Sequence, residues 1–469
     1  MAEHYEAVVI GTGPGGYVCG IRLAQLGLKT AVVERESLGG VCLNWGCIPS
    51  KAVIHAGKTL ESFGKADAMG IMPGDAAPSV DVGKLRGWKE GIVKRLTGGI
   101  GTLLKSNGAT VLKGTARMTG PKALTVTAED GSEQAITADN IVIATGCRPV
   151  ELPGLPLDDP MIWTAKGALE LEEIPERLGV IGGGIIGLEL GTAFAKLGSK
   201  VTVIELMPNL LTGVDPELAK VVEKGLRKKK IKIYKEARTK SLEKGDDGGV
   251  LVVETKKGEE RIPVDRVLVS VGFRPNTESL GLESTGVEMT DRGYIPKDHR
   301  GATNVAGIWA IGDVTGPPFL AHRASKEGIV VAEAIAGQAS ALDYQCLPSA
   351  IFTDPEIATV GLSAEEAEEA GYEVEVSRFP YAALGRALAS NIKDGSFKLI
   401  SEKGTGVLLG AGIVGSEASN LIAEAAVLIE MGGTVEDLAS TIHAHPTLAE
   451  GLMEAGEVAL GHPIHITRS

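Results

Sequence analysis

Residues 6–16 read EAVVIGTGPGG, an apolar run that breaks into a loop containing four glycines. A helix-like stretch over 17–26 follows, and a second apolar run over 30–33 leads to Glu34. Strand, glycine loop, helix and strand in this order predict a βαβ unit. The sequence therefore predicts an α/β fold that starts from a pair of parallel strands.

The spacing of these glycines matches a dinucleotide-binding loop. Gly11 would make the tight turn, Gly13 would let backbone N–H groups approach a pyrophosphate, and Gly16 would let the helix pack closely on the sheet. The N-terminus of the helix would add its positive dipole. Glu34 is placed to accept a hydrogen bond from a ribose 2′-hydroxyl, although an acid at a strand end is often only a surface residue. Alone, the pattern is weak in a chain with 63 glycines among 469 residues.

The same design returns later in the chain. A strand over 178–181 leads into GGGIIG, which a helix over 188–197 follows. A further strand then ends at Glu205. From Gly11 to Glu34 and from the corresponding glycine to Glu205, the chain advances by the same 23 positions. The glycines of this second copy are Gly182, Gly184 and Gly187. Repetition of the whole pattern predicts two dinucleotide sites in one chain.

Glu205 also indicates which cofactor the second site takes. A carboxylate at this position would repel a 2′-phosphate, and the residues that follow, LMPN, include no Lys or Arg to receive one. The alternative is a solvated acid at a strand end. Because the glycine loop accompanies it, we interpret Glu205 as a ribose ligand and expect NAD rather than NADP.

Composition divides the chain into four regions. A strand over 140–144 precedes the proline-rich connector 152–160, and apolar runs over 267–271 and 308–311 follow the second unit. Later, amphipathic helices such as 419–431 replace the phosphate-loop glycines. The expected regions are the first part of one nucleotide-binding domain (1–150), a second nucleotide-binding domain (151–276), a segment that completes the first (277–346) and an interface domain (347–469). The expected fold class is α/β, with two Rossmann-like domains and a C-terminal α+β domain.

The charge balance excludes several classes of function. The formal net charge is −13, whereas a nucleic-acid-binding surface needs basic residues. No run of 18 or more apolar residues occurs, and the first residues, MAEHYEAVVIGTG, lack the pattern of a signal or transit peptide. We therefore expect no nucleic-acid partner, no membrane attachment and a cytoplasmic location.

Two cysteines share the segment GGVCLNWGCIPSK, residues 39–51. In a regular helix the Cα atoms of Cys42 and Cys47 would lie roughly 8.6 Å apart, beyond the limit of about 7 Å for a disulfide. A bridge therefore needs a distorted turn, which Gly46 makes easy and Pro49 would help to confine. Because a strained bridge is readily reduced, the pattern favours a redox-active pair.

Two alternatives remain for this pair. A zinc site would need two further thiols or imidazoles, and none lies at ligand spacing. Inert buried thiols are the default for cysteines in general, but not for a pair flanked by Gly-Gly, Gly and Pro. The remaining cysteines match no catalytic pattern and are expected to be reduced packing residues: Cys19, Cys147 and Cys346.

The segment HAHPTLAE, residues 443–450, holds two of the eight histidines. An isolated histidine is usually structural or exposed, and His443 fits that interpretation. A metal site from His443 and His445 lacks an obvious third ligand, so no metal is expected. The peptide bond before Pro446 is a candidate for the cis form.

Together these motifs resemble the FAD-dependent pyridine nucleotide–disulfide oxidoreductases, over essentially the full length. In that family's order, the motifs are GTGPGG, GGVCLNWGCIPSK, ATG, GGGIIGLE, IGDV and HAHPTLAE. The resemblance implies non-covalent FAD in the first unit and NAD in the second. It assigns Gly11, Gly13, Gly16, Glu34, Lys51, Gly146, Asp313 and Ala321 to FAD, and Gly182, Gly184, Gly187 and Glu205 to NAD.

The resemblance also implies the redox groups. Cys42 and Cys47 would form the reducible disulfide. Lys51 would pair with Glu189 beside flavin N5, where a cation stabilises negative charge on the reduced ring. From the residues alone, Lys51 could equally be a solvated surface lysine.

The same resemblance assigns a base. His445 would convert a substrate thiol to the nucleophilic thiolate, and Glu450 would orient its ring. In this family the base comes from the other subunit, so the complete site would exist only in a homodimer.

The implied activity is oxidation of protein-bound dihydrolipoyl groups with reduction of NAD to NADH. The partner would be the lipoyl domain of a 2-oxoacid dehydrogenase acyltransferase or the glycine-cleavage carrier protein. Glutathione- and mercuric-reductase-like enzymes are alternatives, but Glu205 disfavours NADP, and the ending GHPIHITRS has no cysteine pair. A non-catalytic flavin- and NAD-binding protein would leave the cysteine and histidine motifs unexplained.

Overall fold

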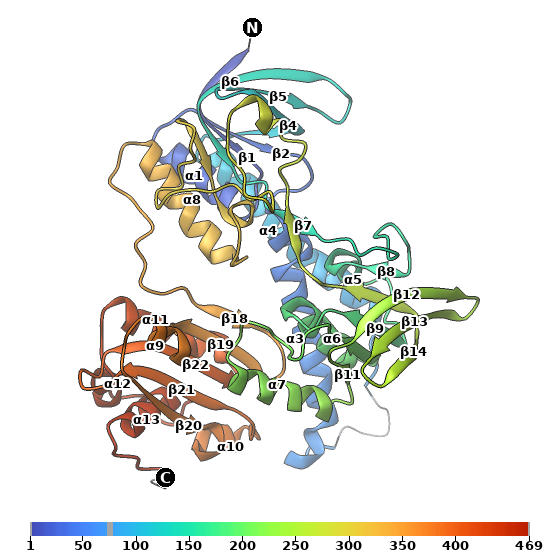
Figure 1. The fold of residues 1–469 in the computed structure, drawn as a ribbon, viewed down its shortest axis with the longest axis vertical. Coiled ribbons are helices and arrows are strands. Elements are labelled where there is room, and N and C mark those ends of the chain that lie inside the picture. Colours follow the sequence, from blue (N-terminus) through green and yellow to red (C-terminus); the bar gives the residue numbers. More distant parts are fainter. Residues whose placement is uncertain (1, 73–77, 468–469) are drawn as a thin grey trace.

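The computed structural model describes residues 2–72 and 78–467. Figure 1 shows three regions: one α/β unit at the top, a second at the lower right and a C-terminal domain at the lower left. A long connection after α8 (Ala321–Ile335) carries the chain from the first unit to the C-terminal domain. Among the described residues, no helix combines the length and apolar character that crossing a bilayer requires.

The first unit is built on a seven-stranded sheet. Its strands follow the order β3 (Thr110–Lys113), β2 (Thr30–Glu34), β1 (Glu3–Ile10), β6 (Glu133–Ile143), β5 (Ala123–Thr127) and β4 (Thr115–Gly120), with β17 (Ile308–Ala310) paired to β6. The β4–β5 and β5–β6 pairs are antiparallel and the others are parallel. The helices of this unit include α1 (Pro14–Gln25), α4 (Val82–Ser106) and α8, and α1 and α8 pack side by side.

The first βαβ unit forms as predicted from the sequence. In the parallel pair β1–β2, Val8 lies opposite Ala31, and the strands are buried because helices cover them. α1 begins at Pro14, three residues earlier than predicted, since proline suits the first position of a helix. The run predicted over 308–311 becomes β17, which joins a strand more than 160 residues earlier in the chain.

The second unit contains a parallel five-stranded sheet. Its order is β11 (Lys232–Tyr234), β10 (Lys200–Ile204), β9 (Arg177–Ile181), β15 (Arg266–Val269) and β8 (Ile162–Trp163). An antiparallel sheet of β12 (Arg238–Gly245), β13 (Gly248–Thr255) and β14 (Gly258–Val264) lies beside it, and β7 (Cys147–Pro149) pairs with β16 (Phe273–Pro275). The helices are α5 (Ala165–Glu170), α6 (Ile185–Leu197) and α7 (Pro216–Lys228).

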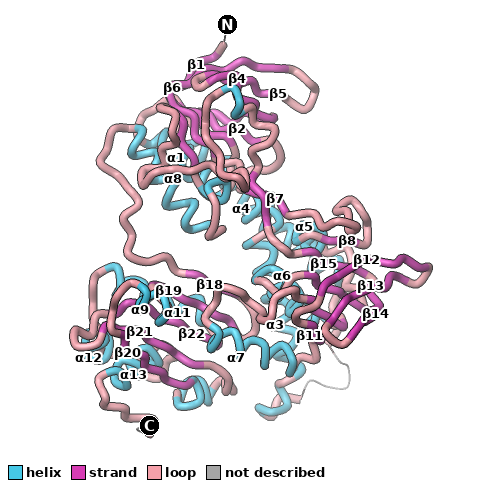
Figure 2. The backbone as a smooth tube through the Cα atoms, viewed as in Figure 1, coloured by secondary structure: helices cyan, strands magenta, loops and turns pink. Residues whose placement is uncertain are grey.

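Helix α6 is the core helix of this unit. Most of its residues are buried, because it is apolar around nearly its whole circumference. It starts at Ile185 rather than Leu188, directly after the second glycine loop. α6 runs beside α3 (Cys47–Gly64), which belongs to the first unit and follows α2 (Gly40–Trp45) (Figure 2). The two α/β units therefore meet at a pair of helices.

The C-terminal domain is an antiparallel sheet covered by helices. Its strand order is β18 (Ser349–Ile351), β19 (Glu356–Gly361), β22 (Leu408–Gly415), β21 (Ser396–Glu402) and β20 (Val374–Pro380). Its helices are α9 (Ala364–Glu369), α10 (Gly385–Ala389), α11 (Ala418–Glu430), α12 (Val435–Ser440) and α13 (Glu450–Ala459). Of the short 3-10 helices, η4 (Tyr381–Ala383) lies in this domain, and the others lie earlier in the chain: η1 (Ala66–Met69), η2 (Leu282–Ser284) and η3 (Gly312–Thr315). The predicted fold class, two Rossmann-like units and an α+β domain, is confirmed.

Truncating the core of α6 should be costly. The Phe194 ring is fully buried and lies 5.9 Å from the Trp163 ring. Phe194→Ala should lower the free energy of unfolding by about 3–5 kcal/mol, because it leaves a cavity. Urea denaturation checks this, with Leu388→Ala as the control, since the Leu388 side chain is exposed. Equal losses for the two variants would contradict the described packing.

Candidate functional site

A large cavity lies where the two α/β units face each other. Its volume is about 2510 Å³, whereas a pocket for one drug-sized ligand typically has about 300–1,000 Å³. Its walls include most of the predicted site residues: Gly11, Gly13, Gly16, Glu34, Cys42, Cys47, Lys51, Gly146, Gly182, Gly184, Glu189, Glu205, Asp313 and Ala321. The cavity therefore has room for more than one extended ligand, and a pair of thiols lies in its wall.

The first glycine loop is shaped by close backbone approaches. A Cβ atom at Gly11 would lie 2.4 Å from the carbonyl oxygen of Ala144, and one at Gly16 would lie 2.0 Å from that of Gly11. A Cβ atom at Gly13, the N-cap of α1, would meet open space. The loop thus packs tightly against Ala144 and leaves its backbone at Gly13 accessible from the cavity, as a ligand-binding loop requires.

Glu34 ties this loop to the end of β2. Its Oε2 accepts hydrogen bonds from the Thr12 N–H at 3.0 Å and the Thr12 hydroxyl at 2.5 Å, and its Oε1 accepts one from the Glu36 N–H at 2.7 Å. The side chain is buried at the cavity wall rather than solvated. The ribose contact assigned to Glu34 stays a prediction.

The second glycine loop repeats this construction. Oε2 of Glu205 accepts a hydrogen bond from the Gly183 N–H at 2.6 Å, and Oε1 accepts one from the Met207 N–H at 2.6 Å. A Cβ atom at Gly187 would lie 2.3 Å from the carbonyl oxygen of Gly182. Gly187 therefore acts through packing, which explains why it does not line the cavity.

The distorted turn predicted between the two cysteines is present. α2 ends at Trp45, Gly46 adopts φ −132° and ψ −115°, and α3 begins at Cys47. A Cβ atom at Gly46 would lie 2.8 Å from the carbonyl oxygen of Val41. The break places Cys42 and Cys47 together in the cavity wall, and both are free thiols in this structure.

The two thiols differ strongly in acidity. A hydrogen bond from Cys42 lowers the pKa of Cys47 to about 7, against the effect of burial and with help from the positive charge of Lys51. The same hydrogen bond, together with burial, raises the pKa of Cys42 far above its ordinary value. Cys47 is therefore the residue that carries a thiolate near neutral pH, and Cys42 is the residue that keeps its proton.

Lys51 and Glu189 form an ion pair between α3 and α6. The Lys51 Nζ lies 2.8 Å from Oε2 of Glu189, so the prediction of this pairing from the resemblance agrees with the observed contact. Oε1 of Glu189 accepts a hydrogen bond from the Phe352 N–H at 2.8 Å, and the Lys51 Nζ lies 4.2 Å from the centre of the Phe352 ring. Phe352 has no motif of its own, so sequence reasoning missed it.

Asp313 presents a partly buried carboxyl group to the cavity. Burial raises its pKa to about 6, Glu327 adds to this effect, and Arg323 opposes it. Because this carboxyl group lines the cavity, it can accept hydrogen bonds from a ligand that carries hydroxyl groups. The neighbouring Gly312 N–H donates to Glu327 at 2.6 Å. Glu327 was missed because, four residues after Arg323, it resembles an ordinary helix ion pair.

His445 and Glu450 form the predicted pair, but away from the cavity. The His445 Nδ1 lies 2.8 Å from Oε1 of Glu450, and the peptide bond before Pro446 is cis. Burial would raise the pKa of Glu450, yet the Thr447 N–H and the His445 ring together hold it below its usual range. The His445 side chain is 77% exposed and does not line the cavity. One chain alone does not bring this base to the thiols.

His443 has a different environment from His445. Its Nε2 lies 2.6 Å from Oε1 of Glu424, and its side chain is 6% exposed. The structural interpretation of His443 therefore agrees with its burial.

The thiol pair allows a test of Lys51. Replacing Lys51 by Met removes the positive charge and should raise the pKa of Cys47 by about one unit, slowing its alkylation at pH 7 about fivefold. Iodoacetamide labelling of the reduced protein, read by peptide mass spectrometry, measures this. Lys58→Met, on the exposed side of the same helix, is the control. An unchanged rate of Cys47 alkylation in the Lys51→Met variant would exclude the electrostatic role of Lys51.

Comparison with known proteins agrees with this arrangement. Residues 5–328 match the family described as pyridine nucleotide-disulphide oxidoreductase, and residues 347–456 match its dimerisation domain. The dihydrolipoyl dehydrogenase of Haloferax volcanii is 47% identical over 469 residues, covering 99% of this chain and 98% of its own. The dihydrolipoyl dehydrogenase of Geobacillus stearothermophilus is 48% identical over 466 residues, with the same coverage.

Solved structures have the same overall fold. LpdA from Mycobacterium tuberculosis has a TM-score of 0.89 and 27% identity, over 97% of this chain and 99% of that one. The Cu(II) complex of the HOCl-induced flavoprotein disulfide reductase RclA from Escherichia coli has a TM-score of 0.86 and 27% identity, over 98% of this chain and 100% of that one. The two matched regions contain both glycine loops, the thiol pair and the His445–Glu450 pair. This chain therefore belongs to the pyridine nucleotide-disulphide oxidoreductase family.

Proposed function

We propose that this chain acts as a dihydrolipoyl dehydrogenase, which oxidises protein-bound dihydrolipoyl groups and reduces NAD. The observation that carries the proposal is the geometry of the cavity, whose wall holds Cys42 and Cys47 beside Lys51 and also holds both glycine loops. The names of the full-length relatives with 47–48% identity give independent support.

FAD is the cofactor proposed for the first unit. The tight first glycine loop and the Asp313 carboxyl group in the cavity wall fit a ligand with a pyrophosphate and a chain of hydroxyl groups. The residues proposed to hold it are Gly11, Gly13, Gly16, Glu34, Lys51, Gly146, Asp313 and Ala321. When bound, the flavin would accept two electrons from the dithiol and pass a hydride to NAD.

NAD is proposed for the second unit, where Gly182, Gly184, Gly187 and Glu205 would contact it. The Glu205 carboxylate lies in the cavity wall, and exposed Leu206 and Met207 follow it. Leu206 and Met207 offer no cation to a 2′-phosphate, which supports NAD over NADP.

The proposed thiol chemistry uses both subunits of a homodimer. His445 of the partner subunit takes a proton from one substrate thiol, and the resulting thiolate attacks Sγ of Cys42. The Cys42–Cys47 bond breaks, and Cys47 leaves as a thiolate, which its low pKa favours. The second substrate thiol then attacks the substrate sulfur bonded to Cys42 and releases the lipoyl disulfide. Cys42 takes up the second proton, as its raised pKa favours.

Two features support the homodimer. The C-terminal region matches a dimerisation domain, and His445 is exposed on it, outside the cavity of its own chain. We propose the domain division 1–150 with 277–346 for FAD, 151–276 for NAD and 347–469 for the interface, since β17 joins the first sheet. The proposed substrate is the lipoyl domain of a 2-oxoacid dehydrogenase acyltransferase or the glycine-cleavage carrier protein.

Replacing Cys42 tests this function. Cys42→Ser should abolish NADH formation from dihydrolipoamide while FAD stays bound, because the serine cannot form the disulfide. The assay follows absorbance by NADH, with reduced glutathione as the alternative substrate and Cys346→Ser as the control. Full activity in the Cys42 variant would refute the mechanism, and a preference for glutathione would indicate another disulfide reductase.

A further inference from the structure

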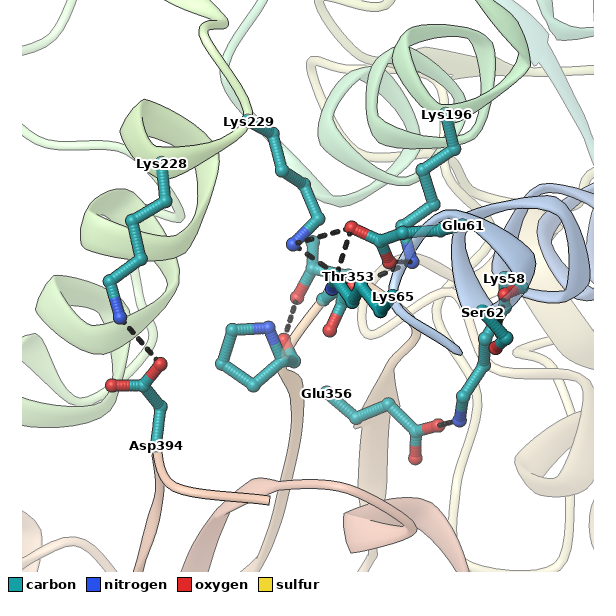
Figure 3. A network of polar contacts seen from close by, with 12 residues as sticks. Lys58, Glu61, Ser62, Lys65, Lys196, Lys228, Lys229, Thr353, Glu356 and Asp394 are labelled. Carbon is teal, nitrogen blue, oxygen red and sulfur yellow. Dashed lines mark hydrogen bonds and ion pairs between the residues drawn. The ribbon is translucent and has the colours of Figure 1, made fainter. Parts of the chain in front are cut away.

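A cluster of four charged residues lies where the first unit, the second unit and the C-terminal domain meet. We call it the Asp354 cluster; it consists of Glu61, Lys196, Lys229 and Asp354. The Lys196 Nζ lies 2.6 Å from Oδ2 of Asp354 and 3.1 Å from Oε2 of Glu61. The Lys229 Nζ lies 3.0 Å from the same Asp354 oxygen and 3.7 Å from Oε1 of Glu61. Figure 3 shows Lys196 and Lys229 approaching Glu61 from different parts of the second unit.

The cluster is largely removed from water, and Lys65 adds a further positive charge, with its Nζ 3.0 Å from Oε1 of Glu61. The Lys196 side chain is only 4% exposed and that of Lys229 is 17% exposed. Burial would raise the pKa of Asp354, but the two ammonium groups hold it well below its usual range. Because desolvation offsets much of the attraction in such pairs, their main effect is to fix geometry rather than to add net stability.

The Asp354 cluster joins the same two helices as the Lys51–Glu189 pair. Glu61 lies ten residues after Lys51 on α3, a rise of about 15 Å, and Lys196 lies seven residues after Glu189 on α6, a rise of about 10 Å. Next to the Asp354 cluster, a Cβ atom at Gly57 would lie 3.2 Å from Cβ of Lys196. α3 and α6 are therefore in close contact and are joined by an ion pair near each end. In the Lys51–Glu189 pair the lysine lies on α3, whereas in the Asp354 cluster Lys196 lies on α6.

The segment 352–355 contacts both the Asp354 cluster and the Lys51–Glu189 pair. Asp354 binds Lys196, and two residues earlier Phe352 contacts both Lys51 and Glu189. The segment is also held from α7, where a Cβ atom at Gly225 would lie 2.8 Å from the carbonyl oxygen of Asp354. A shift of Asp354 would therefore move the backbone N–H and the ring that hold the catalytic ion pair.

We infer that the Asp354 cluster is a positioning device, which holds α3, α6 and Phe352 together so that the Lys51 ammonium stays beside Cys47. This role deepens the proposed function and rests on it, since it concerns the thiol that function uses. Its direct consequence is measurable without substrate. Removing the cluster lets Lys51 move, so Cys47 loses part of the positive charge that favours its thiolate.

The readout is the acidity of Cys47 in the reduced holoprotein. The charged and titratable groups that act on this thiol are Cys42, Lys51 and Glu189, and Tyr17 interacts with Cys42. None of these belongs to the Asp354 cluster, so a change in Cys47 must be transmitted through the structure.

Lys196→Met removes the central charge and keeps the length of the side chain. Lys398→Met is the matched control: its side chain is 8% exposed, and its Nζ lies 2.6 Å from Oδ2 of Asp215, so it also joins the second unit to the C-terminal domain. Both variants are expected to lower the Tm. Only Lys196→Met is expected to slow Cys47 alkylation at pH 7, by about twofold for a pKa rise of half a unit.

Asp354→Asn gives a second route if Lys196→Met fails to fold, because it keeps the size of the side chain and removes one charge. It is expected to slow Cys47 alkylation in the same direction. Alkylation profiles equal to wild type in the folded cluster variants, or equal slowing in Lys398→Met, would overturn the inference. Since dihydrolipoamide is not used, these outcomes are distinct from failure of the proposed function.

Discussion

The ion pair between Lys51 and Glu189 is the contact on which the site depends. Glu189 is almost fully buried, and a buried carboxylate without partners would be strongly destabilising. Its two oxygens are therefore both engaged, one by the Lys51 ammonium and one by the Phe352 N–H. Lys51 lies one helical turn after Cys47, so the same pair sets the charge beside the thiols. The first unit, the second unit and the C-terminal domain are thus held together at the cavity wall.

Features that depend on local backbone geometry were predictable from the sequence. The glycine loops were recognisable because Gly11 and Gly182 each need a backbone approach that a Cβ atom would block. The same holds for the broken helix at Gly46, because a disulfide between the two cysteines would require a distorted turn at their spacing. Helix starts were less accurate, since residues such as Pro14 can open a helix before its apolar pattern begins.

Features that depend on contacts between distant segments were not predictable. Phe352 and Asp354 acquire their roles only because α3, α6 and the C-terminal domain converge. Glu327 looks like a helix-surface acid in the sequence, yet it is buried and holds the loop of Asp313. The resemblance supplied the Lys51–Glu189 pairing, but the spacing of two residues 138 positions apart carries no such information. It also supplied the role of His445, whose exposed position outside the cavity became visible only in the fold.

In the proposed cycle, electrons from a dihydrolipoyl group enter through Cys42 and Cys47 and leave on NAD. Anaerobic alkylation with mass spectrometry distinguishes the entry of electrons at the cysteines from their exit on NAD. With dihydrolipoamide alone, both cysteines should become labelled, since oxidation of one dithiol reduces one disulfide. Adding NAD before the label should return both to the disulfide, with NADH formed in proportion. NADH formation from dihydrolipoamide while Cys42 and Cys47 stay unlabelled under both conditions would contradict the account.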